Sequence, residues 1–235
     1  MKQRKLSMEQ KRADIDLWII IITIVMVLGF YTIFSVPIME FVKNVDIPVL
    51  IRTICSAFLQ FGIAGLGITI VCMLRKESFL SYGLHRKNLF LTIILSAVMF
   101  VPNILFTIVT GDFKGYLPLQ NIWVTKDVLL SSIPNRIIGM ALIATAWGFF
   151  EGFNYVVIMD KLNIRYQNKN KWLDIGAITC AIMCILIHGA IGVTPKGIIE
   201  MLTTLVIIYG MLMVRKFTGN AWGCVFVFVF LWNAY

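Results

Sequence analysis

The stretch AWGFFEGFNYVVIMDKL, residues 146–162, reads as a membrane-spanning helix that carries a single carboxylate, Glu151, inside its apolar run. An ionised carboxylate in hydrocarbon costs several kcal/mol unless it is protonated, is paired, or faces a water-filled cavity. We therefore expect the neighbouring helices to offer Glu151 a polar pocket.

The composition of the whole chain agrees with a membrane protein. Apolar residues make up 59% of the 235 positions and charged residues only 14%, whereas soluble proteins average about 25% charged residues. The net charge of +9 sits in short clusters between apolar stretches, and no basic helical face interleaved with aromatic residues is present. We therefore expect the lipid bilayer to be a partner, and we expect no nucleic-acid binding.

Seven stretches are long and apolar enough to cross a bilayer, which takes about 20 residues as a helix. They are residues 17–38, 49–74, 89–110, 135–159, 173–193, 197–214 and 219–235. Residues 116–133 are too polar to span, and we expect them to lie at the membrane interface before Pro134 starts the fourth helix. The fold class predicted from these stretches is all-α, a polytopic bundle of about seven transmembrane helices forming one membrane domain, residues 17–235.

The lysines and arginines predict the orientation, because cytoplasmic loops carry the excess of basic residues. Fifteen of the 21 basic residues fall in the tail, residues 1–16, and in alternate loops, and the other six fall on the opposite side. The sequence thus predicts an integral, multi-pass protein whose basic tail is cytoplasmic.

Three polar residues lie deep in the predicted spans: Glu151 in the fourth, His188 in the fifth and Asn233 in the seventh. Gly148 and Gly152 flank the glutamate with small-residue spacing, which lets another backbone approach closely. Intramembrane ionisable groups are functional by default, although histidine and asparagine also join helices by hydrogen bonds without any chemistry. Both readings stay open.

Cysteines and the remaining ionisable residues favour structural roles. Cys180 and Cys184 precede His188 at four-residue steps, and these are zinc-type ligands, but helix packing produces the same spacing and no Cys-x-x-Cys pair is present. A divalent metal is therefore only weakly supported, and no other cofactor is indicated. The five cysteines mostly read as buried small hydrophobic residues. We expect His85 to be solvated, and Glu200 to pair with Arg52 or Arg136.

The order of Glu151 on one helix, His188 on the next and Asn233 near the end of a later one resembles the CPBP family, the membrane CAAX-protease and bacteriocin-processing group that includes type II CAAX prenyl endopeptidases. Members carry Glu-Glu-x-x-x-Arg, then Phe-x-x-x-His, then His-x-x-x-Asn, and the resemblance covers residues 135–235. The resemblance implies a hydrolase in which a glutamate activates water and the histidine and asparagine orient that water and stabilise the oxyanion.

The match to these motifs is partial. Gly152 stands at the second glutamate, no arginine follows at the expected place, Cys184 replaces the phenylalanine, and Val229 occupies the second histidine position. Losing one donor to a developing oxyanion costs on the order of a hundredfold to a thousandfold in rate. The valine alone is enough to make such an enzyme slow or inactive.

Three functions follow as hypotheses. The first is an intramembrane endopeptidase in which Glu151, His188 and Asn233 are catalytic and the substrate is a peptide or membrane protein, with a prenylated substrate as one option. The second is a catalytically inactive scaffold or immunity protein of the same fold. The third is a small proton- or cation-coupled transporter, in which Glu151 and His188 relay protons or hold a cation.

Overall fold

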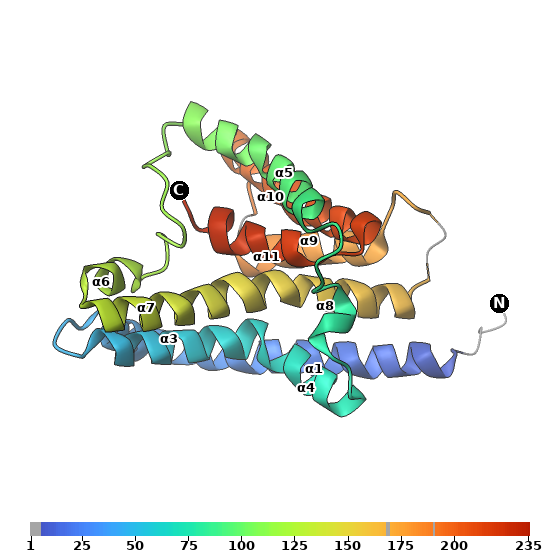
Figure 1. Cartoon of the computed structure of the whole chain (residues 1–235), viewed down its shortest axis with the longest axis horizontal. Helices are drawn as coiled ribbons and strands as arrows, with labels where there is room; N and C mark the ends of the chain where they lie inside the picture. Colours follow the sequence, from blue (N-terminus) through green and yellow to red (C-terminus); the bar gives the residue numbers. More distant parts are fainter. Residues whose placement is uncertain (1–5, 168–169, 190) are drawn as a thin grey trace.

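The computed structural model describes residues 6–167, 170–189 and 191–235, and the regular elements within these ranges are all helical (Figure 1). The longer helices are α1 (Met8–Ile33), α3 (Val49–Ala64), α5 (Leu89–Val109), α7 (Ile133–Ile143), α8 (Glu151–Arg165), α9 (Ile175–Ile187) and α10 (Pro195–Thr218). The shorter ones are α2 (Ser35–Lys43), α4 (Leu66–Arg75), η1 (Phe79–Tyr82), α6 (Thr125–Leu130) and α11 (Trp222–Phe226), and two π-helical turns are η2 (Ala144–Phe150) and η3 (Val227–Trp232). The all-α prediction is confirmed.

Four of the described helices are long and apolar enough to cross a membrane: α1, α5, α10 and the continuous helix Ile133–Arg165 formed by α7, η2 and α8. A fifth candidate is the pair α3 and α4, which is bent by 57°. The two remaining apolar helices, α9 and the unit Trp222–Trp232, are short, and 13 residues rise only about 20 Å against a hydrocarbon core of about 30 Å. A polytopic helical bundle agrees with these elements, but the predicted number of seven crossings is not confirmed.

Helix α1 begins within the segment expected to be a tail. Ser7 and Gln10 form a capping box, each side chain bonding the other's backbone N–H, so the helix starts nine residues before the predicted span. Lys2, Arg4 and Lys5 of the tail, and Lys169 of a later basic cluster, lie outside the described residues.

The second predicted span is broken at Gly65. A Cβ built on Gly65 would lie 2.4 Å from the ring of Phe61 and 2.7 Å from the ring of Phe150, so only glycine fits between these two side chains. The break lets α4 turn away from the line of α3 while both rings pack edge to face, with centroids 4.8 Å apart. Two short helices at an angle therefore replace the single straight one.

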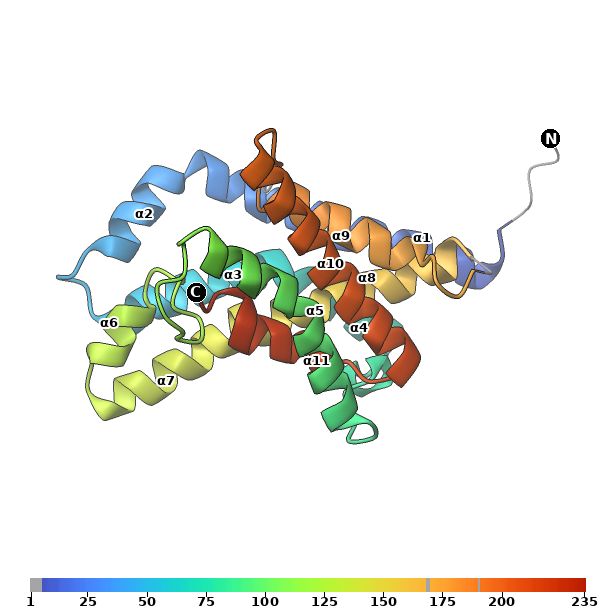
Figure 2. The ribbon, with the colours of Figure 1, turned by 90° about the horizontal axis from the view of Figure 1, so that it is seen from above.

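Helix α8 is the central element of the bundle. Residues 151–159 are all buried, whereas only Thr92, Ser96 and Phe100 of α5 are buried. α1 and α9 pack along α8, and α3 packs along α7, so that α1, α3, α7 and α8 run side by side (Figure 1). Seen from above, α5, α10 and α11 cross this layer at an angle (Figure 2). The central position of α8 places Glu151 inside protein.

Charged side chains from five helices form a network at the end of the bundle where α1 begins. Its ion pairs are Asp16–Arg75, Asp16–Lys161, Glu77–Lys161, Asp14–Arg165, Asp160–Arg215 and Asp174–Lys216, with N–O distances of 2.5 to 3.0 Å. The partners come from the start of α1, the ends of α4, α8 and α10, and the residue that caps α9. Of the basic residues that the sequence assigned to one side, five take part in these ion pairs: Arg75, Lys161, Arg165, Arg215 and Lys216.

Two carboxylates of this network lie outside the candidate spans. Burial opposes ionisation of Glu77, but the ammonium of Lys161 and the hydroxyl of Tyr82 outweigh it, and the pKa of Glu77 is lowered. Burial likewise opposes ionisation of Asp174, yet Lys216, the Ala177 backbone N–H and the Asn163 amide lower its pKa. The network thus holds both groups ionised.

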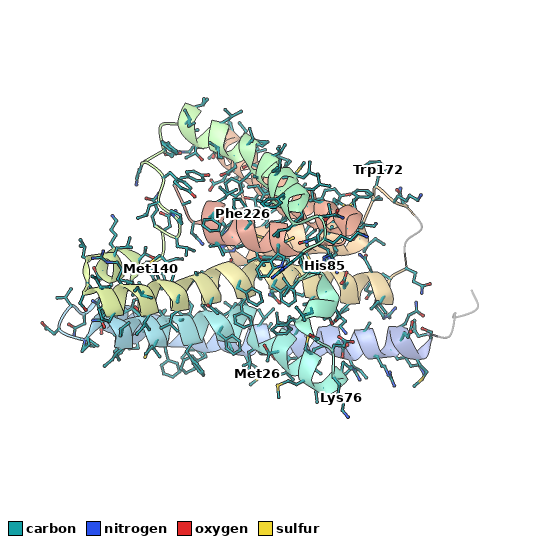
Figure 3. The ribbon with its side chains drawn as sticks, viewed as in Figure 1. Met26, Lys76, His85, Met140, Trp172 and Phe226 are labelled. Carbon is teal, nitrogen blue, oxygen red and sulfur yellow. The ribbon has the colours of Figure 1, made fainter. Side chains whose placement is uncertain are left out.

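The surface near this network is basic and solvated. Lys76 and His85 are both exposed, as expected for His85, and Figure 3 shows Lys76 at the tip of α4, directed away from the bundle.

At the opposite end, the segment expected at the interface, residues 116–133, is helical mainly in α6. Its backbone N–H groups at Leu117 and Asn121 donate to the carbonyls of Ala234 and Asn233. This loop therefore fastens the C-terminal residues to the bundle.

Candidate functional site

Glu151 is bonded through both of its carboxylate oxygens. Oε1 lies 3.3 Å from His188 Nε2, and Oε2 accepts a hydrogen bond of 2.8 Å from Gln60 Nε2. The glutamate side chain is only 9% exposed, while the His188 side chain is 38% exposed. A buried carboxylate thus reaches the molecular surface through the histidine, and the predicted polar pocket for Glu151 is present.

The π-helical turn η2 directly precedes Glu151. Such turns arise from one extra residue in a helix and are frequent at functional sites, because they redirect the side chains that follow. A second π-helical turn, η3, packs directly against η2 and precedes Asn233. The helical periodicity of the sequence gave no indication of either turn.

His188 lies at the C-terminal end of α9 rather than inside a long span. Its backbone N–H still donates to the Cys184 carbonyl at 3.0 Å, so the four-residue stripe of Cys180, Cys184 and His188 is real. The backbone leaves the helical conformation at the next residue, because Gly189 has a φ of +64°, in the left-handed region. Ending the helix at this residue leaves one edge of the imidazole open to a cavity.

Gln60 of α3 is a site residue that the sequence analysis missed. It is a lone amide in the apolar run of the second predicted span, which was a usable signal because a buried amide seeks a hydrogen-bond partner. Its N–H group satisfies the Glu151 oxygen that His188 does not reach. Gln60 therefore stands where a second polar partner of the glutamate is needed.

The glycines beside Glu151 pack against backbone, as predicted. A Cβ on Gly152 would lie 2.7 Å from the Cys224 carbonyl oxygen, and a Cβ on Gly148 would lie 2.3 Å from Val229 Cγ2. No side chain fits at position 152, so a second glutamate there is sterically excluded. Val229 of η3 fills the space opposite Gly148 of η2, while Gly152 of α8 packs against Cys224 of α11, so both departures from the motifs lie where the C-terminal helical unit contacts the helix of Glu151.

Asn233 is half-buried and follows the end of η3. Its carbonyl accepts from the Asn121 N–H at 3.2 Å, and the neighbouring Trp232 ring lies 5.5 Å from the His188 ring. Within the described part of the chain, its side chain makes no hydrogen bond to Glu151 or His188. A catalytic role of Asn233 stays a prediction.

The sulfur and carboxylate groups do not assemble into a metal-type cluster. No group of three or more His, Cys, Asp or Glu side chains in suitable positions occurs among the described residues. Cys180 Sγ instead lies 3.5 Å from the Tyr155 carbonyl, and four of the five cysteines are buried while Cys55 is exposed.

The predicted pairing of Glu200 with Arg52 or Arg136 is not found. Arg52 binds Asp127 at 2.7 Å instead, and Arg136 donates to the Ser131 carbonyl.

Two hollows lie on either side of the Gln60–Glu151–His188 chain. The first, here called the apolar groove, has a volume of about 890 Å³ between α1, α2 and α3, and both Gln60 and Trp147 line it. The second, here called the polar cavity, has a volume of about 580 Å³ and is lined by His188 together with residues of α5, α10 and the C-terminus. Glu151 is thus the buried link between an apolar and a polar compartment.

Comparison with known proteins adds no relative. No model of a protein family matches the chain, no curated protein matches it, and no solved structure matches it. The resemblance to the CPBP family therefore depends only on the order of Glu151, His188 and Asn233 and on the short motifs around them.

Proposed function

We propose that this chain is a membrane-embedded peptidase that uses Glu151 as the general base on a water molecule. The observation that carries the proposal is the 3.3 Å contact between the Glu151 carboxylate and His188, at the wall of a polar cavity. A general base must lie within hydrogen-bond reach of its partners, and a buried carboxylate is a common choice.

The proposed chemistry is a simple hydrolysis. Glu151 removes a proton from water, the resulting hydroxide attacks the peptide carbonyl, and the same proton passes to the leaving nitrogen. His188 orients the water and faces the developing oxyanion from the cavity side. Asn154 Oδ1, one turn after Glu151, is buried without a hydrogen-bond partner among the described residues and offers a further acceptor for that water.

The non-catalytic alternative has two specific observations in its favour. Both Glu151 oxygens already have partners in Gln60 and His188, and Gly152 and Val229 are closely packed where the CPBP motifs have two polar residues.

A transporter needs a polar path on both sides of the glutamate. Beyond Gln60 the groove is lined mainly by apolar side chains, which does not favour a transporter.

The decisive experiment is a cleavage assay with purified protein in lipid nanodiscs and a defined synthetic peptide library in water enriched in ¹⁸O. The proposal expects new peptide C-termini that carry one ¹⁸O. Glu151→Gln removes the base and should abolish cleavage, and His188→Ala should lower the rate on the order of a hundredfold.

Glu40→Gln is the matched control, because Glu40 is an exposed carboxylate of α2 outside both hollows and should leave cleavage unchanged. Cleavage by Glu151→Gln would contradict the proposal. A wild type that retains peptide without cleaving it would identify the scaffold alternative instead.

For the orientation, we propose that the ion-pair end faces the cytoplasm and that the polar cavity opens on the other side. The concentration of basic residues at that end supports it. A protease applied to intact cells should then spare an N-terminal tag, and removal of the tag would contradict this orientation.

A further inference from the structure

The polar cavity carries an unbalanced charge. Its lining includes three charged side chains, Asp112, Lys196 and Glu200, besides His188. Lys196 Nζ pairs with Asp112 at 2.6 Å, and no lysine or arginine of the described residues forms a salt bridge with Glu200. After this internal pairing, one carboxylate remains for a ligand of opposite charge.

Aromatic rings form another wall of the same cavity. Phe100, Trp232 and Tyr235 line it, with the Phe100 ring 6.4 Å from Trp232 and 6.0 Å from Tyr235. The face of an aromatic ring attracts a cation, and the attraction is strongest where water is partly excluded. A carboxylate and several π faces in one cavity are a combination that binds an organic ammonium group.

We propose that the polar cavity binds the alkylammonium side chain of a lysine in a peptide, with Glu200 as its counter-charge and Trp232 and Tyr235 as its aromatic partners. Asn103 contributes an amide whose N–H already donates to Thr203 Oγ1 at 3.1 Å, so its carbonyl oxygen can accept from the ammonium. An anionic ligand is disfavoured, since the only lysine that lines the cavity is neutralised by Asp112.

This inference rests on the proposed function in one respect, the peptide nature of the ligand. His188 lines the same cavity, so a peptide whose lysine contacts Glu200 places a nearby backbone segment beside the Glu151–His188 pair. Glu200 then determines substrate specificity, without taking part in the hydrolysis.

The test is a binding experiment that needs no turnover. Glu151→Gln protein in phosphatidylcholine nanodiscs is immobilised and offered pairs of synthetic peptides, identical except for lysine or norleucine at one position, and retained peptides are quantified by mass spectrometry. We expect lysine peptides to be enriched about fivefold or more over their norleucine partners. Empty nanodiscs, whose lipid carries no net charge, correct for binding to the bilayer.

The double variant Glu151→Gln/Glu200→Gln should lose this enrichment, whereas Glu151→Gln/Glu40→Gln should keep it. Replacing Glu200 with lysine should reverse the preference, toward peptides that carry glutamate at the varied position. An enrichment close to one in the Glu151→Gln protein, or one that survives Glu200→Gln in a protein with unchanged thermal unfolding, would overturn the proposal. Because binding is measured separately from cleavage, this result and the cleavage assay can fail independently.

Discussion

The ion-pair network and the Gln60–Glu151–His188 chain are both polar groups inside an apolar bundle, but they satisfy their charges differently. In the network every buried charge faces a charge of opposite sign, as Lys161 does between Asp16 and Glu77. Glu151 instead has an amide and an imidazole as partners, and the imidazole lines a cavity.

This contrast separates a structural role from a chemical one. The paired charges of the network hold the ends of α1, α4, α8 and α10 in place. Each of these charges already has a partner of opposite sign, so none of them is available to a ligand. A buried carboxylate with uncharged or titratable partners can exchange a proton with a ligand in the cavity.

Replacing Lys161 with methionine should destabilise the protein most. The lysine side chain is 5% exposed and Asp16 is 2% exposed, so its removal takes one of two cationic partners from a buried carboxylate. Breaking a buried pair in this way typically costs about 3 to 5 kcal/mol. Thermal unfolding in nanodiscs measures the loss.

The matched control is Lys196→Met, which removes a lysine from an exposed pair with Asp112. Exposed pairs contribute little, so this variant should unfold at the wild-type temperature. Equal destabilisation by the two variants would show that the network is no more structural than the surface pair.

Replacing Gly152 with alanine should have the next largest effect. The new Cβ would meet the Cys224 carbonyl at 2.7 Å, and overpacking against backbone costs about 1 to 3 kcal/mol. Gly29→Ala in α1, which meets nothing within 4 Å, should be neutral or slightly stabilising. The difference in unfolding temperature between the two variants measures how closely α11 and η3 pack against α8 beside Glu151. Equal unfolding temperatures would contradict the close contact between Gly152 and the Cys224 carbonyl.

Acid should weaken the network end before the rest of the bundle. The folded pKa values of Glu77 and Asp174 lie below their usual values of 4.5 and 3.8, so their stabilisation is complete above those values and is lost as pH falls through the lowered ones. The unfolding temperature of wild type should therefore fall below about pH 4.5. The double variant Glu77→Gln/Asp174→Asn should start lower and respond less to pH, and an equal slope for both proteins would contradict the assignment.

Gln60→Leu should destabilise the protein less than Lys161→Met and should have its larger effect on activity. It removes one hydrogen bond to the buried carboxylate of Glu151, and hydrogen bonds to charged groups are worth about 1.5 to 3 kcal/mol, while the apolar groove accepts leucine. Loss of the Gln60 hydrogen bond should also lower the rate in the cleavage assay, because the Glu151 carboxylate is then less well oriented. Phe58→Leu on the exposed face of the same helix is the control, and a stability loss as large as that of Lys161→Met would place Gln60 with the structural charges.

The apolar runs were enough to predict a helical chain in which several helices are long and apolar enough to cross a membrane. They did not predict the early start of α1, which depends on Ser7, Gln10 and the distant partners of Asp14 and Asp16. They also overestimated the lengths of α9 and the C-terminal helix. Hydropathy depends on composition alone and does not show where the backbone hydrogen bonds of a helix end.

The site was partly predictable for a similar reason. An isolated ionisable residue in an apolar run is visible in sequence, and Glu151 and His188 were both chosen as candidate site residues for this reason. Gln60 lies 91 positions before Glu151, and the π-helical turns depend on how η2 and η3 pack, so neither follows from local spacing. Glu200 was assigned to the wrong partner because Arg52 is taken by Asp127.

The bonds of Asp16 impose an order on biogenesis. Its carboxylate needs Arg75 from α4 and Lys161 from α8, so α1 holds a charge whose last partner is synthesised 145 positions later. Until α8 is inserted, the early hairpin of α1, α3 and α4 remains an incomplete unit. The arrival of α8 is then the event that both completes the ion pairs of Asp16 and brings Glu151 to Gln60.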